Sequence, residues 1–95
     1  GLLHLHSINM IHRDISCRNL LVTRDMDVRI SDFGLTVRAT LGHYDSSNEK
    51  LPWRWMPPES LKCRRGGHRR FTYRSDIWAA GVTLWEIWNK GKKPY

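Results

Sequence analysis

Residues 75–90, SDIWAAGVTLWEIWNK, form the segment that most constrains the fold of this 95-residue chain. The segment contains no proline and is long enough for about four helical turns. A surface helix carries its apolar side chains on one stripe, but here they occur on nearly every face. They are Ile77, Trp78, Val82, Leu84, Trp85, Ile87 and Trp88. The segment therefore predicts a helix inside a larger body, and it indicates that the chain is a fragment of that body.

The other periodic segments predict short elements. Residues 1–8 are expected to end a helix, and Asn9 fits its stop. Residues 20–23 and 28–31 are rich in β-branched side chains and flank a polar turn, which predicts a short antiparallel hairpin. The letters PPES predict a short helix that runs to about Lys62, because proline is tolerated in a first turn.

Residues 10–19 and 32–58 show no clean period and are expected to be loops. The second loop is broken by Gly34, Gly42, Pro52, Pro57 and Pro58. Loops of that length in compact domains are usually functional or disordered. The basic run 63–70 is expected to be a solvated surface loop, and its role is left open.

The net charge of +7 raises the question of an acidic or phosphate-bearing partner. Specific nucleic-acid binding is not expected. No aromatic residues interleave the arginine run, and no helix-turn-helix, RNA-platform or zinc-finger signature occurs. No apolar run reaches about 18 residues, so no membrane segment is predicted in this chain.

Cysteine and histidine usage argues against a metal or disulfide framework. Cys17 and Cys63 lie far apart without a CxxC pattern. Free thiols fit a reducing compartment. His4 and His6 lie among leucines and are expected to be ordinary helix residues.

The stretch HRDISCRN, residues 12–19, concentrates groups that suit phosphoryl chemistry. Asp14 is a carboxylate that can accept the proton of a hydroxyl group. Asn19 offers an amide oxygen and Asp32 a carboxylate, and both are hard ligands of the kind that Mg²⁺ prefers. The predicted hairpin lies between them and would turn both ligands toward one point. Each residue alone could be a cap or turn former, but their joint occurrence in this order favours the chemical interpretation.

Four motifs resemble the catalytic core of the protein kinase family. They are HRDISCRN at 12–19, SDFG at 31–34, WMPPE at 55–59 and SDIWAAGVTLWEI at 75–87. They occur in the family's order and at near-family spacings, so the resemblance covers the whole chain. It implies an α+β, protein-kinase-like fold, here a mainly α fragment of the C-terminal lobe with a short β-hairpin.

Within that family the chain resembles tyrosine kinases, in particular those of the receptor type. Serine/threonine kinases usually carry Lys two residues after the catalytic Asp, where this chain has Ser16. Arg18 instead follows Asp14 by four residues, as in HRDLAARN. The segment LPWRWMPPES resembles LPV(R/K)WM(A/P)PE, in which Pro52 shapes the platform for a peptide tyrosine. The implied reaction transfers the γ-phosphoryl group of ATP, with Mg²⁺, to a protein tyrosine.

The resemblance also implies the catalytic roles. Asp14 would be the base and Arg18 the group that orients it. Asn19 and Asp32 would be the metal ligands, and Leu21 would lie beneath the adenine of ATP. The implied location is cytoplasmic, either in a separate kinase or in the cytoplasmic portion of a membrane receptor.

Regulatory and structural roles follow from the same resemblance. Tyr44 lies twelve residues after Asp32, where the family's autophosphorylated tyrosine commonly occurs, and its loop is expected to be mobile before modification. Arg13, with Arg38, would pair with the phosphate. The residues implied to be structural are His12 and Phe33, which would stack together, Gly34, Glu59, and Asp76, which would hydrogen-bond the catalytic-loop backbone.

The chain also departs from the family pattern. Pro57 replaces the usual Ala, Trp53 replaces a Val or Ile of the peptide platform, and Ala79 and Ala80 replace Ser and a large aromatic residue. No glycine-rich phosphate loop, VAIK lysine or partner-glutamate helix occurs, nor the later arginine that would pair with Glu59.

We therefore expect residues 1–95 to be a partial kinase domain that lacks the nucleotide-binding lobe and the last helices, with no useful activity alone. Two alternatives stay open. One is a tyrosine-kinase-like serine/threonine kinase, and the other is an inactive truncated kinase or pseudokinase-like binding module. Neither the substrate nor the oligomeric state is indicated.

Overall fold

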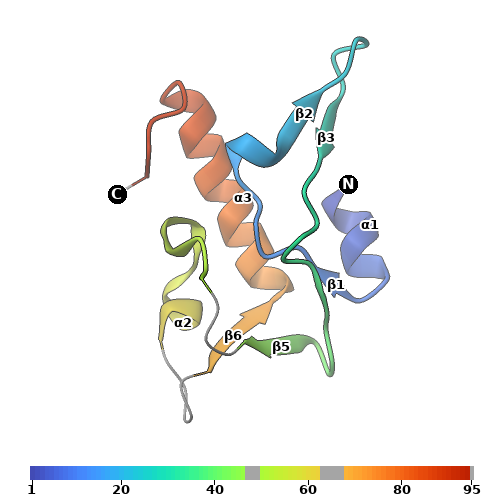
Figure 1. Ribbon diagram of the computed structural model, residues 1–95, viewed down its shortest axis with the longest axis vertical. Helices are drawn as coiled ribbons and strands as arrows, with labels where there is room; N and C mark the ends of the chain where they lie inside the picture. The colour runs from blue at the N-terminus through green and yellow to red at the C-terminus, as the bar shows by residue number, and fades with distance from the viewer. Residues whose placement is uncertain (47–49, 63–67, 95) are drawn as a thin grey trace.

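The computed structural model describes residues 1–46, 50–62 and 68–94 (Figure 1). The helices of this part are α1 (Leu2–Ser7), α2 (Pro58–Leu61) and α3 (Tyr73–Trp88), with the 3₁₀ turns η1 (Cys17–Asn19) and η2 (Trp53–Trp55). The strands are β1 (Met10–Ile11), β2 (Leu20–Val22), β3 (Val28–Ile30), β4 (Val37–Arg38), β5 (His43–Ser46) and β6 (Arg69–Thr72). The strands form antiparallel pairs, β1 with β4, β2 with β3 and β5 with β6. Small strand pairs around a long helix agree with the expected α+β class.

The pair β2–β3 is the predicted hairpin. Leu20 lies opposite Ile30 and Val22 opposite Val28. The turn is closed by the Thr23 N–H, which donates to the Asp27 carbonyl at 2.8 Å. Figure 1 shows the hairpin projecting from the body of the molecule. Its base joins the segment 12–19, called the catalytic loop below, to the SDFG segment.

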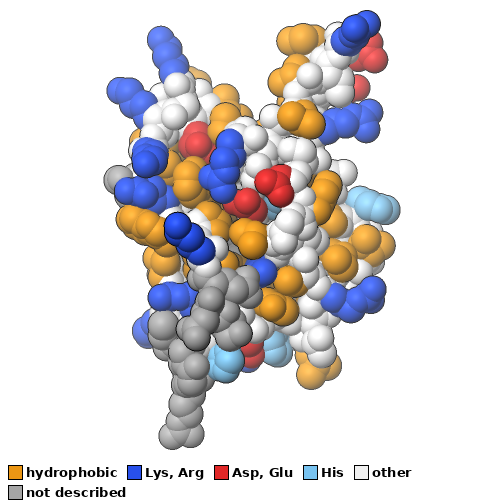
Figure 2. Space-filling view, in the orientation of Figure 1, with side chains coloured by type: hydrophobic (Ala, Val, Ile, Leu, Met, Phe, Trp, Pro, Cys, Tyr) orange, Lys and Arg blue, Asp and Glu red, His pale blue; other side chains and the backbone are white. Residues whose placement is uncertain are grey.

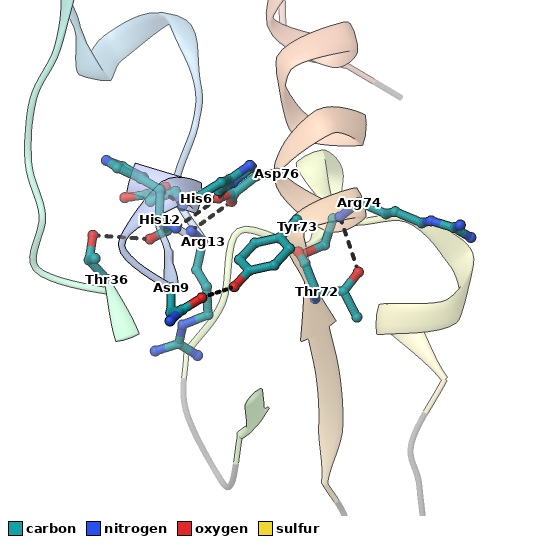
Figure 3. Close-up of polar contacts among 11 residues, drawn as sticks. His6, Asn9, His12, Arg13, Thr36, Thr72, Tyr73, Arg74 and Asp76 are labelled. Atoms are coloured by element: carbon teal, nitrogen blue, oxygen red, sulfur yellow. Dashed lines mark hydrogen bonds and ion pairs between the residues drawn. The ribbon is translucent and has the colours of Figure 1, made fainter. Parts of the chain in front are cut away.

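The long helix α3 begins two residues before the predicted start because Thr72 caps it. The Thr72 hydroxyl oxygen accepts a hydrogen bond from the Arg74 N–H at 3.1 Å (Figure 3). The Ser75 hydroxyl oxygen accepts one from the Thr72 N–H, also at 3.1 Å. This reciprocal capping box satisfies backbone donors that the first turn would leave free.

The face that α3 buries is small and polar rather than apolar. Its buried residues are Ser75, Asp76, Ala79, Thr83 and Glu86. Their spacing of three and four residues places them on one side of the helix. The large apolar side chains point elsewhere, and Trp88 is 87% exposed. The apolar side chains thus occupy nearly every face of α3, and the exception is the polar stripe that faces the catalytic loop.

Two predicted loops contain short strands. β1 lies within 10–19, and β4 and β5 lie within 32–58. The strand β6 also includes Arg69 and Arg70, which were expected in a surface loop. The expectations are wrong here because each strand has only two to four residues and pairs with a segment distant in the sequence, which leaves no local period to detect. The remainder of the basic run, with Cys63, lies outside the described residues.

The apolar core is small and lies between the catalytic loop and the β5–β6 pair. Its centre consists of Ile11, Met56 and Phe71, each at most 5% exposed. The partly buried residues packed against this centre are Val37, Ala39, Tyr44, Leu51 and Tyr73. Each loop or short element contributes only one or two side chains to this core. The core therefore joins loops and short strands, and it does not lie between regular layers of helix and sheet.

Three expectations from the sequence concern membrane-spanning segments, the state of the cysteines and the distribution of basic charge. Within residues 1–46, 50–62 and 68–94, no helix has the length and apolar character needed to cross a bilayer. Cys17 carries a free thiol. Lys and Arg side chains occur on both sides of the face drawn in Figure 2 and on the projecting hairpin. On this face the basic charge is thus not confined to one element.

The capping box yields a prediction about stability. Replacing Thr72 with Ala in the complete domain removes the hydroxyl acceptor and should lower the free energy of unfolding by about 1 kcal/mol. Thr72→Ser keeps the acceptor and is the matched control. Urea denaturation measures both variants. Equal midpoints for the Ala and Ser variants would show that the cap contributes nothing.

Candidate active site

The catalytic loop is attached to α3 through the carboxylate of Asp76. This side chain is 1% exposed. Its Oδ2 accepts a hydrogen bond from the His12 N–H at 2.8 Å, and its Oδ1 accepts one from the Arg13 N–H at 3.0 Å (Figure 3). These are the backbone contacts that the resemblance implied. The Nε2 of His6 also lies 2.9 Å from Oδ2, so a residue expected to be an ordinary part of helix α1 joins the same carboxylate.

Arg13 connects the catalytic loop to the segment that follows SDFG. Its φ of 67° lies in the left-handed region, which is unfavourable for a residue with a side chain. Its Nε–H donates to the Leu35 carbonyl at 2.8 Å. The guanidinium carbon lies 4.8 Å from the centre of the Tyr44 ring and 5.1 Å from that of Phe71. The buried Arg13 side chain therefore extends toward the residue expected to be regulatory.

His12 ties the catalytic loop to the SDFG segment. Its Nδ1 accepts a hydrogen bond from the Asp14 N–H at 3.1 Å, and its Nε2 lies 3.1 Å from the Ser31 carbonyl. A carbonyl only accepts, so these contacts assign the proton to Nε2. The Phe33 ring meets the imidazole edge to face, with centroids 5.3 Å apart and planes at 63°. The two rings contact each other as expected, but edge to face instead of stacked.

Asp14 is buried and held by Arg18. Nη2 of Arg18 donates to Oδ1 of Asp14 at 2.7 Å, a short charge-assisted hydrogen bond. The Arg18 guanidinium carbon also lies 5.4 Å from the centre of the Trp55 ring. This hydrogen bond fixes one carboxylate oxygen and leaves Oδ2 to accept a proton.

Asn19 lies at the base of the hairpin, where the chain returns. Its Nδ2 donates to the Asp14 carbonyl at 2.7 Å, which orients the amide and leaves Oδ1 for a ligand. Its own carbonyl accepts the Ser31 N–H at 2.8 Å and the Ser31 hydroxyl at 3.0 Å. These bonds bring the residue preceding Asp32 against Asn19.

Asp32 is exposed, and its carboxylate contacts the backbone two residues further along the chain. Oδ1 accepts a hydrogen bond from the Gly34 N–H at 3.2 Å. A Cβ atom at position 34 would lie only 3.2 Å from the same oxygen. Glycine at position 34 therefore leaves room for this carboxylate, and a larger residue would push it aside.

The oxygen donors fit Mg²⁺ as a partial set. Asn19 contributes an amide oxygen and Asp32 a carboxylate, and Mg²⁺ binds a few such protein ligands together with substrate phosphates and water. The described ranges contain no group of three or more His, Cys, Asp or Glu residues able to hold a metal. The donor set thus suits a metal that arrives with a phosphate ligand better than a metal caged by protein alone.

The other candidate residues lie around this centre. Leu21 is exposed on β2, and Glu59 is exposed in the first turn of α2. Arg38 is exposed on β4. Tyr44 is half-buried on β5, opposite Phe71.

The strand that contains Tyr44 is held by charge as well as by backbone pairing. Nε and Nη2 of Arg70 donate to the two carboxylate oxygens of Asp45 at 2.9 and 3.2 Å. The hydrogen bond that Arg70 donates to Asp45 raises the pKa of the Arg70 guanidinium above its ordinary value. The Ser46 hydroxyl donates to the Arg69 carbonyl at 3.2 Å. Residues 43–46 thus form a strand where a loop was expected, because residues from β6 supply the partners that the local sequence lacks.

Glu86 is a residue of the site that the sequence motifs did not single out. It is 7% exposed on α3. Its Oε1 accepts hydrogen bonds from the Cys17 N–H at 2.9 Å and from Nε1–H of Trp55 at 2.7 Å. A signal was present, since a carboxylate ten residues after Asp76 in an apolar helix falls on the same face and needs buried partners.

The catalytic loop, the SDFG segment and the long helix thus meet in a site of the protein-kinase type. A profile described as "Protein tyrosine and serine/threonine kinase" matches residues 1–95. The chain belongs to this family.

Three relatives illustrate the similarity. The chain is 40% identical to the tyrosine-protein kinase csk-1 of Caenorhabditis elegans, 43% to the high affinity nerve growth factor receptor of Gallus gallus and 39% to ephrin type-A receptor 1 of Homo sapiens. The matches cover 100% of the chain in each case. They cover only 17%, 12% and 9% of the respective relatives, so the chain spans a small part of each.

The role of Asp76 can be tested by removing its charge. Asp76→Asn keeps one acceptor oxygen but places an NH₂ group against a backbone donor. A buried N–H left without a partner costs about 1–3 kcal/mol, so the free energy of unfolding of the complete domain should fall by that amount. Asp25→Asn, on the exposed hairpin turn, is the matched control. If both variants unfold at the same urea concentration, the anchor does not stabilise the fold.

Proposed function

We propose that the protein carrying this chain transfers the γ-phosphoryl group of ATP to tyrosine side chains of proteins. The observation that supports this most is the arrangement of Asp14. Its buried carboxylate accepts a hydrogen bond from Arg18 at 2.7 Å. The backbone of the loop that carries it donates two hydrogen bonds to Asp76. Phosphoryl transfer requires little more from a protein than placement of the hydroxyl, charge stabilisation and a proton acceptor.

In this proposal Asp14 acts as the general base. Oδ2 of Asp14 would take the proton of the substrate phenol as the phenol oxygen bonds to the γ-phosphorus of ATP. The bond from that phosphorus to the β,γ-bridging oxygen would break, and ADP would leave. Arg18 holds the carboxylate in place, and its charge lies beside the incoming phenol. The hydrogen bond from the Asp14 N–H to Nδ1 of His12 further restrains the loop at this residue. The chain thus positions the base from both its backbone and its side chain.

The cofactors proposed are ATP and Mg²⁺. Asn19, through Oδ1, and Asp32 would hold the metal. Mg²⁺ would neutralise charge on the phosphate oxygens. Leu21, exposed on β2, would contact the adenine ring. The contacts of Ser31 with Asn19 keep the two candidate ligands at the same end of the hairpin.

Tyrosine is the proposed acceptor for reasons of residue placement. Position 16 holds a buried serine, and the cation beside Asp14 comes from Arg18, which lies against Trp55 of the platform. The relatives named above include a tyrosine-protein kinase. A serine/threonine specificity and an inactive, binding-only protein are the alternatives, and the assay below distinguishes them.

The proposed setting is the cytoplasm, with protein or peptide tyrosine as partner. The relatives include proteins named as kinases and proteins named as receptors. Either kind of parent is compatible with this proposal, and no nucleic-acid partner is proposed.

Asp14→Asn tests the base in a complete kinase domain that contains these residues. The variant keeps the shape of the side chain but loses the proton acceptor, so kcat should fall about 10²- to 10⁴-fold at saturating ATP. The assay follows ³²P transfer to a tyrosine peptide and to its serine and threonine counterparts. Asp25→Asn is the control.

The outcomes separate the alternatives. Equal turnover of serine and tyrosine peptides would contradict the proposed specificity, and no turnover by the parent domain would favour the binding-only protein. A parental kcat for Asp14→Asn would exclude Asp14 as the base. The 95-residue chain itself is expected to show no turnover above a heat-killed sample.

We also infer that phosphorylation of Tyr44 regulates the parent enzyme. Its ring packs at the edge of the core, 4.8 Å from the Arg13 guanidinium carbon. A phosphate adds about −1.5 to −2 charges and three acceptor oxygens, which cannot stay at an apolar core edge. Modification would therefore release β5 from β6 and favour new pairs with Arg13 and Arg38. The backbone of Arg13 precedes Asp14 directly, so this change would reach the base.

Tyr44→Phe is the test of this switch. The variant keeps the ring but lacks the oxygen, so preincubation with Mg²⁺·ATP should activate the parent domain and not the variant. Tyr73→Phe, which also removes one tyrosine hydroxyl group, is the control, and preincubation should activate this variant as it activates the parent domain. Mass spectrometry locates the phosphate. If Tyr44 remains unmodified in a fully active enzyme, the switch lies elsewhere.

A further inference from the structure

A chain of side-chain contacts runs from the long helix to the proposed base. It begins at Glu86 on α3, whose Oε1 accepts Nε1–H of Trp55 at 2.7 Å. The Trp55 ring centre lies 5.4 Å from the guanidinium carbon of Arg18. Arg18 donates to Asp14 at 2.7 Å. Three segments that are distant in sequence, α3, η2 and the catalytic loop, are therefore connected in series.

The first contact is strong and directional. Glu86 is buried, and a buried carboxylate is tolerated only with good hydrogen-bond donors. Its Oε1 takes two of them, the Trp55 indole and the Cys17 N–H at 2.9 Å. Hydrogen bonds to an ionised acceptor are roughly twice as strong as neutral ones. The indole has a single N–H, so this bond fixes both the position and the tilt of the ring.

The second contact, between the Trp55 ring and the Arg18 guanidinium, helps to position Arg18. A guanidinium group near an indole ring is attracted by the ring's π electrons. The Arg18 side chain is 55% exposed, so few other protein atoms restrain it. Its end is placed by the Asp14 carboxylate on one side and by the Trp55 ring on the other. Losing the ring would let Arg18 move away from the geometry that holds Asp14.

We propose that Glu86 is a positioning residue for phosphoryl transfer, acting through Trp55 and Arg18 on Asp14. This inference rests on the proposed function. The same Oε1 holds the catalytic loop at Cys17 and the peptide platform at Trp55, so it also couples the position of the platform to that of the base. A displacement of reacting groups by about 1 Å can cost 10²-fold in rate, which gives the contact a measurable effect on kcat.

A purely structural role for Glu86 makes different predictions. It would lower stability without changing the turnover of the molecules that remain folded. A positioning role instead lowers kcat in folded protein and leaves KM for ATP unchanged, because none of the three contacts involves the proposed nucleotide ligands Asn19 and Asp32. It also makes the effects of substitutions at Glu86 and Trp55 non-additive, because each of them weakens or removes the same hydrogen bond.

The experiment uses four variants of a complete kinase domain that contains these residues. Glu86→Gln removes the charge, Trp55→Phe removes the indole N–H, and the third variant combines both changes. Trp88→Phe is the control, because Trp88 lies two residues from Glu86 on the same helix but outside the buried stripe that contains Glu86. Steady-state kinetics with a tyrosine peptide and ATP are measured, and circular dichroism gives the folded fraction of each variant.

We expect kcat to fall about 10-fold or more in Glu86→Gln and in Trp55→Phe, within the range known for misplaced groups. The double variant should fall no further than the worse single variant, and Trp88→Phe should match the parent. If Glu86→Gln does not fold, Trp55→Phe alone decides. Parental kcat in the folded variants, or losses that multiply in the double variant, would overturn the inference. A parent domain without tyrosine kinase activity would contradict the proposed function instead.

Discussion

The carboxylate of Asp76 is the interaction on which the rest of the site depends. A carboxylate that is 1% exposed must have its oxygens hydrogen-bonded, and it receives the backbone donors of His12 and Arg13 and the ring of His6. These donors come from helix α1 and from the start of the catalytic loop. The backbone of Arg13 is left-handed, and the hydrogen bond from its N–H to Asp76 offsets part of that cost. This carboxylate therefore holds the two residues that directly precede Asp14.

Glu86 extends the same principle along the helix. Ten residues separate it from Asp76, a distance of about 15 Å along the axis at 1.5 Å per residue. Asp76 holds the start of the catalytic loop, and Glu86 holds its 3₁₀ turn at Cys17 together with Trp55. The long helix therefore holds the site through two carboxylates, Asp76 at one end of the site and Glu86 at the other. This explains why its buried stripe is polar although its overall composition is apolar.

The sequence predicted the parts of this arrangement that short motifs encode. The β2–β3 hairpin, the short helix near Pro58 and the long helix follow from residues close together. The contact of Asp76 with the loop backbone was implied by the resemblance to protein kinases. The strands β4, β5 and β6 did not, because their stability comes from partners such as Arg70 opposite Asp45, twenty-five residues apart. Glu86 was missed for a related reason. Its partners are one backbone N–H and one indole N–H, and the sequence does not reveal which acceptor either of these donors binds.

Arg13 links regulation to catalysis if Tyr44 has the proposed role. Its backbone N–H is bonded to Asp76 and its carbonyl side leads directly to Asp14, while its guanidinium lies beside the Tyr44 ring. The backbone end is therefore fixed by the helix, and the side-chain end contacts the Leu35 carbonyl and the Tyr44 ring. A charge added at Tyr44 would act on the side-chain end without dismantling the anchor. Such a division lets one residue transmit the state of the Tyr44 segment to the base while the fold around Asp76 stays intact.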